Sequence, residues 1–233
     1  MSNVYDCARP DSRAAGLAAA ASAARGGRLV VLPTDTVYGL GCDAFSSTAV
    51  QGLLDAKGRG RDMPVPVLVG SWSTVDGLVL GVPARARTLI EAFWPGGLSL
   101  VLPHASSLAW DLGDTRGTVM LRMPLHPVAL ELLRDVGPMA VSSANRSGLP
   151  PATTVEQARE QLAERVSVYL DGGPSGAPLA STIIDLTGDD PVVLREGAVT
   201  VAQLSEALGH TVITEHPGQG RIRPSDGTQP RRG

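Results

Sequence analysis

The sequence is poor in aromatic residues and in cysteine, and each shortage excludes a class of function. Aromatic side chains make up 3% of the 233 residues, too few for the stacking platform that proteins use to bind single-stranded nucleic acid. The cysteines, Cys7 and Cys42, are too far apart to predict a disulfide framework or a zinc site. The formal net charge of −3 gives no general attraction to nucleic acid or anionic membranes. Any anion site must therefore be local.

Long apolar runs and several familiar motifs are also missing. No run reaches the roughly 18 apolar residues of a membrane helix, and no cleavable leader is visible at the N-terminus. We therefore expect a cytoplasmic, reducing compartment and no membrane contact. The Walker pattern, the G-x-G-x-x-G fingerprint after a strand and the G-x-S-x-G elbow of hydrolases are absent. If the chain binds phosphates, it does so by a different arrangement.

The chain has one lysine, at position 57, whereas its other 19 basic residues are arginine. Lys57 begins the stretch Lys57-Gly58-Arg59-Gly60-Arg61, in which three cations alternate with glycines. Glycine lets a backbone approach a ligand closely, and clustered cations attract anions, phosphate above all. We expect Lys57 and Arg59 in a solvent-facing loop. The alternative is a solvated helix end, because cations also suit helix C-termini.

Apolar periodicity, capping residues and Gly or Pro breaks predict helices interspersed with strands. The predicted helices start at a cap on Asp11 or Ser12, at a cap on Ser46 or Ser47, at 83, at 127, at a cap on Thr153 or Thr154 with Glu156 as capping-box partner of Thr153, and at 201. The predicted strands are 28–32, 65–69, 98–102, 118–122, 139–141, 166–170, 182–186 and 192–194. Several strands follow one another directly, which predicts an α/β (α+β) fold with an open, twisted, mixed sheet flanked by helices. Residues 1–209 form the predicted domain, and the polar segment 210–233 is expected to be disordered.

Polar residues follow predicted strands at four places, 34–36, 118–122, 142–145 and 181–182. Ligands of open α/β sheets bind in the crevice at strand ends, so we expect these loops to border a concave cleft. Cations beside hydroxyl groups suit a nucleoside polyphosphate together with a small carboxylate-bearing molecule. No serine has beside it the histidine and carboxylate pair that would activate it as a nucleophile.

Seven segments resemble the YrdC/Sua5 family and occur in that family's order over about 30 to 200. They are PTDTVYGLG (33–41), KGRGRDMP (57–64), WPGGLSLVL (94–102), TVMLRMPLHP (118–127), SSANRSGLP (142–150), DGG with STIID (171–173 and 181–185) and LREG (194–197). The resemblance implies the short YrdC-type form, with a YrdC-like sheet and cleft. It also implies synthesis of L-threonylcarbamoyladenylate from L-threonine, bicarbonate and ATP, with release of pyrophosphate. That product serves the N6-threonylcarbamoyl modification of adenosine 37 in tRNAs that read ANN codons, after hand-over to the transferase machinery. A weak tRNA contact is a further expectation.

The resemblance also implies residue roles. The catalytic set is Lys57, Arg59, Ser143 and Asn145, which match the family's K-x-R and S-x-N signatures. The ATP-binding set is Lys57, Arg59, Met63, Thr118, Ser142, Ser143, Asn145 and Arg195. The threonine-binding set is Thr36, Arg122, Ser181 and Thr182, with Arg122 clamping the carboxylate bidentately. Mg²⁺ is expected on the ATP phosphates and no metal on the protein. The alternatives are that Arg122 is a surface arginine ending a strand, and that Ser181 and Thr182 are ordinary strand polarity.

The chain departs from the family pattern at a few positions. Met63 and Leu68 replace an asparagine and a histidine that relatives often carry, Pro151-Ala152-Thr153 replaces S-P-T, Ala180 replaces glutamate and Glu196 replaces proline. An RNA-binding module for tRNA or double-stranded RNA is the alternative function, and it should show strong salt dependence. Carbamoyl transfer, as in the YrdC-like portion of hydrogenase-maturation proteins, is a second alternative. The oligomeric state and any need for a monovalent cation stay open.

Overall fold

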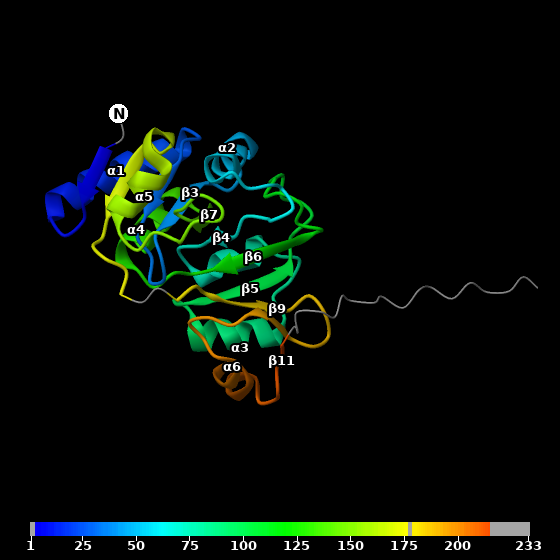
Figure 1. Ribbon diagram of the computed structural model, residues 1–233. Coiled ribbons are helices and arrows are strands. Elements are labelled where there is room, and N and C mark those ends of the chain that lie inside the picture. Colours follow the sequence, from blue (N-terminus) through cyan, green and yellow to red (C-terminus); the bar gives the residue numbers. More distant parts are fainter. Residues whose placement is uncertain (1–2, 177–178, 215–233) are drawn as a thin grey trace, which may run out of the picture.

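One mixed β-sheet organises the part of the chain that the computed structural model describes, residues 3–176 and 179–214. Its strands are β1 Asn3–Asp6, β2 Val30–Leu32, β3 Gly39–Asp43, β4 Val67–Leu68, β5 Leu98–Pro103, β6 Thr118–Arg122, β7 Met139–Ser143, β8 Val168–Asp171, β9 Thr182–Asp185, β10 Val192–Arg195 and β11 Ile213–Thr214. Their order is β1-β8-β2-β3-β7-β4-β6-β5-β9-β10-β11, with parallel and antiparallel neighbours (Figure 1). The sheet is open, as the sequence predicts.

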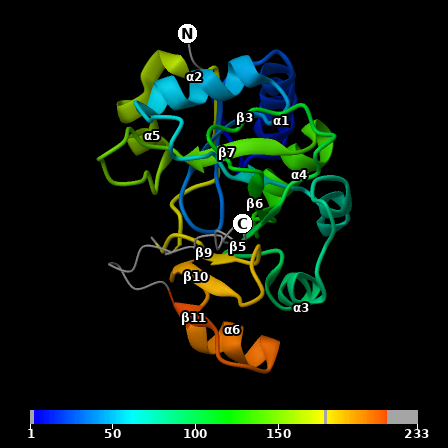
Figure 2. The ribbon, with the colours of Figure 1, turned by 90° about the vertical axis from the view of Figure 1, so that its right-hand side faces the viewer.

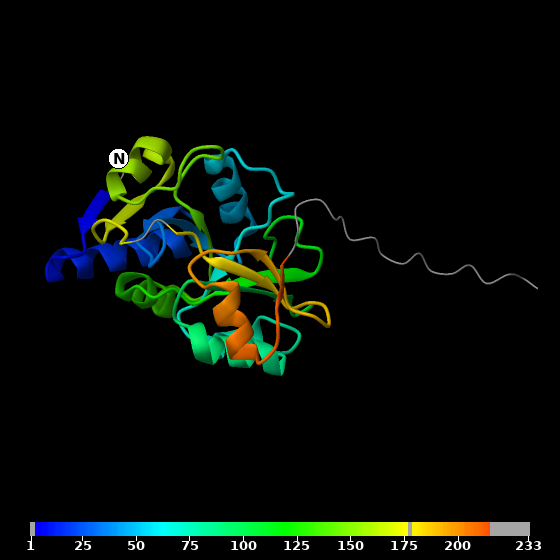
Figure 3. The same cartoon turned by 60° about the horizontal axis from the view of Figure 1, so that its bottom comes forward.

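Helices cover the two faces of this sheet unequally. The α-helices in the same residues are α1 Pro10–Arg25, α2 Ser47–Lys57, α3 Ala84–Phe93, α4 Pro127–Val136, α5 Val155–Leu162 and α6 Val201–Leu208, and short 3₁₀ helices are η1 Trp72–Gly77 and η2 Ala163–Arg165. Helices α1 and α4 pack on one face, over the half that contains β8, β2 and β7. Helices α2, α3, α5 and α6 pack on the other face around the larger core. Figure 2 shows α2 lying across β3 and β7, and Figure 3 shows α3 and α6 together at the opposite end.

The uneven cover leaves part of one sheet face open. On β5, Leu98 and Leu100 are buried in the larger core, while Ser99 between them points to the opposite face. On β6, Met120 and Arg122 have the same orientation as Ser99. Helices α1 and α4 do not extend over these strands, so the exposed floor is available for a ligand.

Helix α2 has a capping residue where the sequence predicts one. Ser46 caps α2 by accepting a hydrogen bond from the Ala49 amide, and Gly58 ends the helix with φ 63°, in the left-handed region that glycine adopts without strain. The helix thus stops at Lys57 and sets the direction of the basic stretch that follows. Helix α6 has a capping box between Thr200 and Gln203.

Several expectations about local structure are wrong. Helix α1 starts at Pro10, not at Asp11 or Ser12, because proline suits the first helical position. Helix α5 is capped by Thr154, and Gln157, not Glu156, binds Thr153. Segment 210–214 is ordered, because Val212 is buried and β11 pairs with β10. The rest of the predicted tail lies outside the described residues.

Strand β3 was not predicted, because its sequence GLGCD suggests a glycine-rich loop. The glycines are needed by the neighbouring strand. A Cβ on Gly39 would lie 2.6 Å from a Val141 side-chain carbon, and one on Gly41 would lie 3.1 Å from another. The side chain of Val141 on β7 thus occupies the space that side chains on β3 would fill.

Candidate active site

A cleft of about 230 Å³ lies over the uncovered part of the sheet. Seven residues from the predicted sets line it: Thr36, Arg59, Arg122, Ser142, Ser143, Ser181 and Arg195. They come from the β2–β3 loop, the basic stretch after α2, and the ends of β6, β7, β9 and β10. The structure therefore brings together segments that are up to 159 residues apart in the chain, as Thr36 and Arg195 are.

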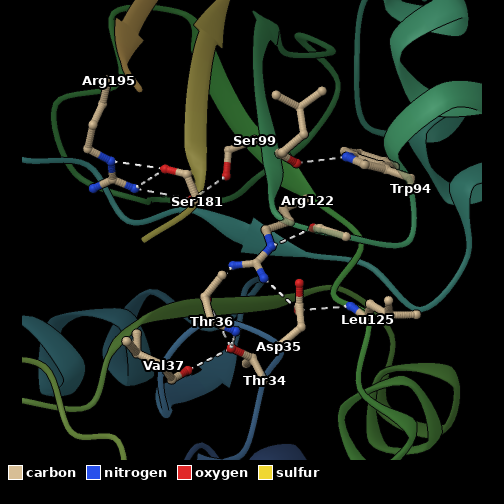
Figure 4. Close-up of polar contacts among 12 residues, drawn as sticks. Thr34, Asp35, Thr36, Val37, Trp94, Ser99, Arg122, Leu125, Ser181 and Arg195 are labelled. Atoms are coloured by element: carbon tan, nitrogen blue, oxygen red, sulfur yellow. Dashed lines mark hydrogen bonds and ion pairs between the residues drawn. The ribbon is translucent and has the colours of Figure 1, made fainter. Parts of the chain in front are cut away.

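Arg122 lies in the floor of the cleft and is tied to the β2–β3 loop (Figure 4). Its side chain is 8% exposed. Nη2 donates to Asp35 Oδ1 at 2.6 Å, Nη1 to the Thr36 hydroxyl at 3.0 Å and Nε to the Gly96 carbonyl at 2.9 Å. Burial lowers the pKa of Arg122, and Asp35 opposes that effect. Each of the three nitrogens has a protein partner, and Nη1 and Nη2 each keep a second N–H that these bonds do not use.

The second wall is built around Ser181, which precedes β9. Its hydroxyl accepts a hydrogen bond from Ser99 at 3.0 Å and one from Arg195 Nη2 at 3.1 Å. Arg195 also donates from Nε and Nη2 to the Ser181 carbonyl, at 3.0 and 2.8 Å. Figure 4 shows Ser99, Ser181 and Arg195 in line beside Arg122. Arg195 therefore keeps Nη1 for a ligand, since no partner of that atom is present among the described residues.

Arg59 forms another part of the cleft wall. Its Nη1 donates to the Ser142 hydroxyl at 3.2 Å, and its Nε is buried without a hydrogen-bond partner in the described part of the chain. Burial lowers the pKa of the guanidinium, yet arginine stays charged. A buried, unsatisfied donor on a permanent cation favours an anionic ligand. Arg59 therefore fits the predicted anion-binding role.

Lys57 does not occupy the solvent-facing loop that was expected. It is the last residue of α2, is 3% exposed and does not line the cleft. Its ammonium instead donates to the carbonyls of Ser143, the last residue of β7, and of Asn145. The end of β7 and the segment that follows it, 143–149, are called the β7 loop below. Burial and, to a smaller extent, the charge of Arg59 lower the pKa of Lys57 to about 8. The apolar face of α2 continues into its last turn, which explains why a single charged residue there is buried.

Other predicted residues also lie outside the cleft lining. Asn145 is buried, and its amide contacts other residues of its own loop and Lys57. Thr182 is fully buried, and its hydroxyl accepts from the amides of Gly197 and Val199. Thr118 donates its hydroxyl proton to the Thr115 carbonyl. Met63 is 52% exposed and also lies outside the lining.

The sequence did not lead us to predict that Ser99 lines the cleft or that Asp35 holds Arg122. Ser99 lines the cleft and is 3% exposed. It could have been found as a polar residue that interrupts the apolar strand LSLVL, since alternate positions of a strand face opposite sides. Asp35 is in none of the predicted sets, yet it is the ion-pair partner of Arg122.

Three positions that depart from the family pattern also border the cleft: Leu68, Pro151 and Ala180. Together with Met120 and Ile183 they make part of its lining apolar. Glu196 instead accepts a hydrogen bond from the Val201 amide at 2.8 Å and holds the start of α6. The departures thus change the lining of the cleft and leave its two arginine walls intact.

The Sua5/YciO/YrdC family, described as "Telomere recombination", matches residues 22–197. The chain belongs to this family. A putative threonylcarbamoyl-AMP synthase of Mycobacterium leprae is 66% identical over 209 residues, which cover 90% of this chain and 95% of the relative. Threonylcarbamoyl-AMP synthase of Bacillus subtilis is 40% identical over 195 residues, which are 83% of this chain and 56% of the relative.

A solved structure agrees with the sequence comparisons. P. abyssi Sua5 complexed with L-threonine resembles this chain with a TM-score of 0.85 and 33% identity, over 92% of this chain and 62% of that chain. The family and the open mixed sheet predicted from the sequence are therefore confirmed.

Proposed function

We propose that the chain is an L-threonylcarbamoyladenylate synthase, which converts L-threonine, bicarbonate and ATP to L-threonylcarbamoyl-AMP, pyrophosphate and water. The observation that carries this proposal is the cleft, which Arg59 and Arg195 line together with serine and threonine hydroxyl groups. Two permanent cations suit a reaction that joins two anions. The name shared by the M. leprae and B. subtilis relatives supports the same activity, and the L-threonine complex of P. abyssi Sua5 supports the amino-acid substrate.

The proposed chemistry needs no covalent enzyme intermediate. The threonine amine combines with bicarbonate to give a carbamate and water. A carbamate oxygen then attacks the α-phosphorus of ATP in line, a P–O bond forms, and the bond to the leaving pyrophosphate breaks. Carbamate and triphosphate repel each other, so positioning is the main task of the protein. Cations already in place at the developing charge supply that stabilisation.

Each wall of the cleft has a proposed role. Arg59 with Ser142 and Ser143 holds the phosphates, since Arg59 Nε has a free donor there. Arg122, Thr36 and Ser181 border the threonine side, where Arg122 fixes the loop and the hydroxyls contact the substrate. Arg195 is assigned to the nucleotide, and its Nη1 has no partner among the described residues.

We propose that Mg²⁺ arrives with ATP. Within the described residues no group of three or more His, Cys, Asp or Glu side chains could hold a metal ion, and Asp35 is already engaged by Arg122. The serine and threonine hydroxyls of the cleft fit a cation that keeps its waters and is carried by phosphates. Bound there, Mg²⁺ would offset phosphate charge.

The adenylate product is expected to pass to the machinery that modifies adenosine 37 of tRNA, with at most a weak tRNA contact by this chain. No helix of residues 3–176 and 179–214 is long and apolar enough to cross a membrane, and we propose a cytoplasmic location. Pyrophosphate release from ATP tests the activity, with threonine and bicarbonate present together and each left out in turn. Release that needs both, with a product of threonylcarbamoyl-adenylate mass, would support the proposal. Release indifferent to threonine, with tight and salt-sensitive tRNA binding, would favour the RNA-binding alternative.

A further inference from the structure

Lys57 is surrounded by neutral oxygen atoms. Its Nζ lies 2.5 Å from the Ser143 carbonyl oxygen, 2.8 Å from the Asn145 carbonyl oxygen and 3.2 Å from Asn145 Oδ1, with the Ser143 hydroxyl further away at 3.5 Å. An ammonium group has three donors, so the three nearer oxygens use all of them. Lys57 therefore has no donor left for a ligand unless it breaks a contact with the β7 loop.

Asn145 completes a two-way connection between α2 and the β7 loop. Its Oδ1 accepts from Lys57, and its Nδ2 donates to the carbonyls of Arg146 at 3.0 Å and Leu149 at 2.7 Å. In return, the Lys57 carbonyl accepts from the Ser147 amide at 2.8 Å. Donor and acceptor groups of both residues are thus satisfied inside the protein. The K-x-R and S-x-N signatures divide accordingly: Arg59 and Ser143 line the cleft, whereas Lys57 and Asn145 lie behind its wall.

Within residues 3–176 and 179–214, no carboxylate compensates the charge of Lys57. None of the ion pairs between described residues includes Lys57, and Arg59 adds a second positive charge nearby. A buried charge normally needs a compensating charge, because the low dielectric makes its isolation costly. Two adjacent cations, one behind the wall and one in it, therefore favour an anion in the cleft.

We propose that Lys57 is a positioning residue and not a phosphate ligand. Acting with Asn145, it fixes the β7 loop so that Ser142 and Ser143 face the cleft beside Arg59, and it adds its charge to the site through that wall. The inference rests on the proposed function, since the compensating anion is the ATP phosphate chain. It predicts that ATP is stabilised by Lys57 without touching it.

The single lysine makes a direct test available. Protein grown with ¹⁵N-lysine gives one Nζ signal. In the free protein we expect slowly exchanging ammonium protons that reflect the buried hydrogen bonds. With saturating ATP, binding is followed independently by the ³¹P shifts. We expect the pKa of Lys57 to rise because an anion is near, while the slow exchange persists and no coupling across a hydrogen bond to ³¹P appears.

Each outcome of this experiment decides something. A ³¹P coupling at Nζ, or loss of the protected ammonium when ATP binds, would overturn the positioning role and leave the synthase proposal intact. Unchanged ³¹P shifts at high protein concentration would overturn the synthase proposal itself, and this inference with it. A fast-exchanging Nζ signal in the free protein would show that the contacts with Ser143 and Asn145 are not formed, which also refutes the inference.

Variants supply a second test, which distinguishes a positioning role in catalysis from a merely structural role. If Lys57 and Asn145 act as a unit, Lys57→Met and Asn145→Ala should each lower kcat, and the double variant should lose no more than the worse single variant. Additive losses would contradict this. Arg165→Met is the matched control, because Arg165 also donates to an α2 carbonyl, that of Ala56 at 3.1 Å, but lies outside the cleft lining; it should leave kcat unchanged.

The pH profile gives a further readout. The β7 loop faces Nζ with neutral atoms, and Arg59 is the charged group that acts on it from the segment after α2. Asn145→Asp places a carboxylate at that position, so the basic limb of the kcat/KM profile, which reports the free enzyme, should move to higher pH. A limb that stays in place in this variant would argue against a role for the charge of Lys57.

Discussion

Arg122 and Asp35 form an ion pair at 2.6 Å in the floor of the cleft, with side chains 8% and 15% exposed. The same Asp35 oxygen accepts the amide of Leu125 at 2.9 Å. The pair therefore joins the end of β6 to the β2–β3 loop, so that the residues bordering the proposed threonine side are held by one buried interaction.

Replacing Asp35 should be damaging because it leaves Arg122 buried without its counter-charge. For Asp35→Asn we expect a loss of about 3–5 kcal/mol in the free energy of unfolding, the usual effect of breaking a buried pair from one side. Urea unfolding measures it. The control is Asp76→Asn, which breaks the exposed pair with Arg87 and should change stability far less. Equal losses in the two variants would refute the role assigned to Asp35.

Arg59→Ala should abolish most of the activity while leaving the fold intact. Arg59 provides the unsatisfied buried donor in the phosphate wall, and loss of one preorganised donor to developing charge lowers kcat by about 100-fold or more. Steady-state pyrophosphate release measures the loss, and circular dichroism checks the fold. Near-normal turnover would show that the phosphates bind elsewhere.

Thr182 should prove structural and not a threonine ligand. Its hydroxyl holds the 197–199 segment through the amides of Gly197 and Val199, at 2.8 and 3.0 Å. Thr182→Val leaves these donors unsatisfied and should cost about 1–3 kcal/mol of stability. Thr182→Ser keeps the hydroxyl and should restore most of it. If Thr182→Val instead kept its stability but raised the KM for threonine, the hydroxyl would belong to the substrate site.

The stability of the protein should depend on pH through Lys57. Burial lowers its pKa from the ordinary 10.5 to about 8. Below pH 8 both folded and unfolded chains carry the proton, and the burial penalty is complete. Between pH 8 and 10.5 the folded chain has released the proton and the unfolded chain keeps it, so the contribution of Lys57 to stability rises by about 3 kcal/mol.

Ionisation of two buried thiols has the opposite effect on stability, over a pH range that overlaps that of Lys57. Burial raises the pKa of Cys7 to about 11 and of Cys42 to about 12, so the unfolded thiols ionise first and stability falls as the pH rises. The contribution of Lys57 is therefore measured by comparing the free energy of unfolding of the original chain with that of Lys57→Met. Urea unfolding at a series of pH values from 7 to 10.5 gives both. A difference that does not change with pH would mean that Lys57 titrates normally.

Truncation tests how much segment 210–214 contributes to stability. Val212 is 3% exposed and its amide donates to the Ser205 hydroxyl at 3.1 Å. Removing residues 210–233 should therefore lower stability by about 2 kcal/mol, the value of one buried valine side chain. Removing 215–233 is the control, because this change keeps Val212 and should avoid that loss. Thermal unfolding and pyrophosphate release compare the two truncated chains.

The sequence predicted the parts of the fold that local signals determine. Ser46 and Gly58 set the ends of α2 through capping and a left-handed turn, and such signals lie within a few residues of the helix. Strand β3 was missed because its glycines are required by Val141, about a hundred residues away in sequence. Local rules contain no information about such a neighbour.

The same distinction applies to the candidate site. The polar segments at strand ends were predicted to meet, and seven of the predicted residues do line one cleft. Which atoms remain free could not be predicted. The hydroxyl of Thr182 and the ammonium of Lys57 are occupied by partners 15 or more residues away, and residue type alone does not distinguish an occupied donor from a free one.

Because helices leave part of one sheet face open, the sheet also determines how the substrate range can be changed. Met120 faces the cleft, while its neighbours Val119 and Leu121 are buried in the core on the reverse side. Altering the side chain at 120 changes the cleft with no direct loss of core contacts, whereas any change that shifts β6 would be transmitted to both sides at once. Enlarging the site for a bulkier amino acid is therefore a matter of replacing single floor side chains such as Met120 or Ile183, with the backbone of the sheet left as it is.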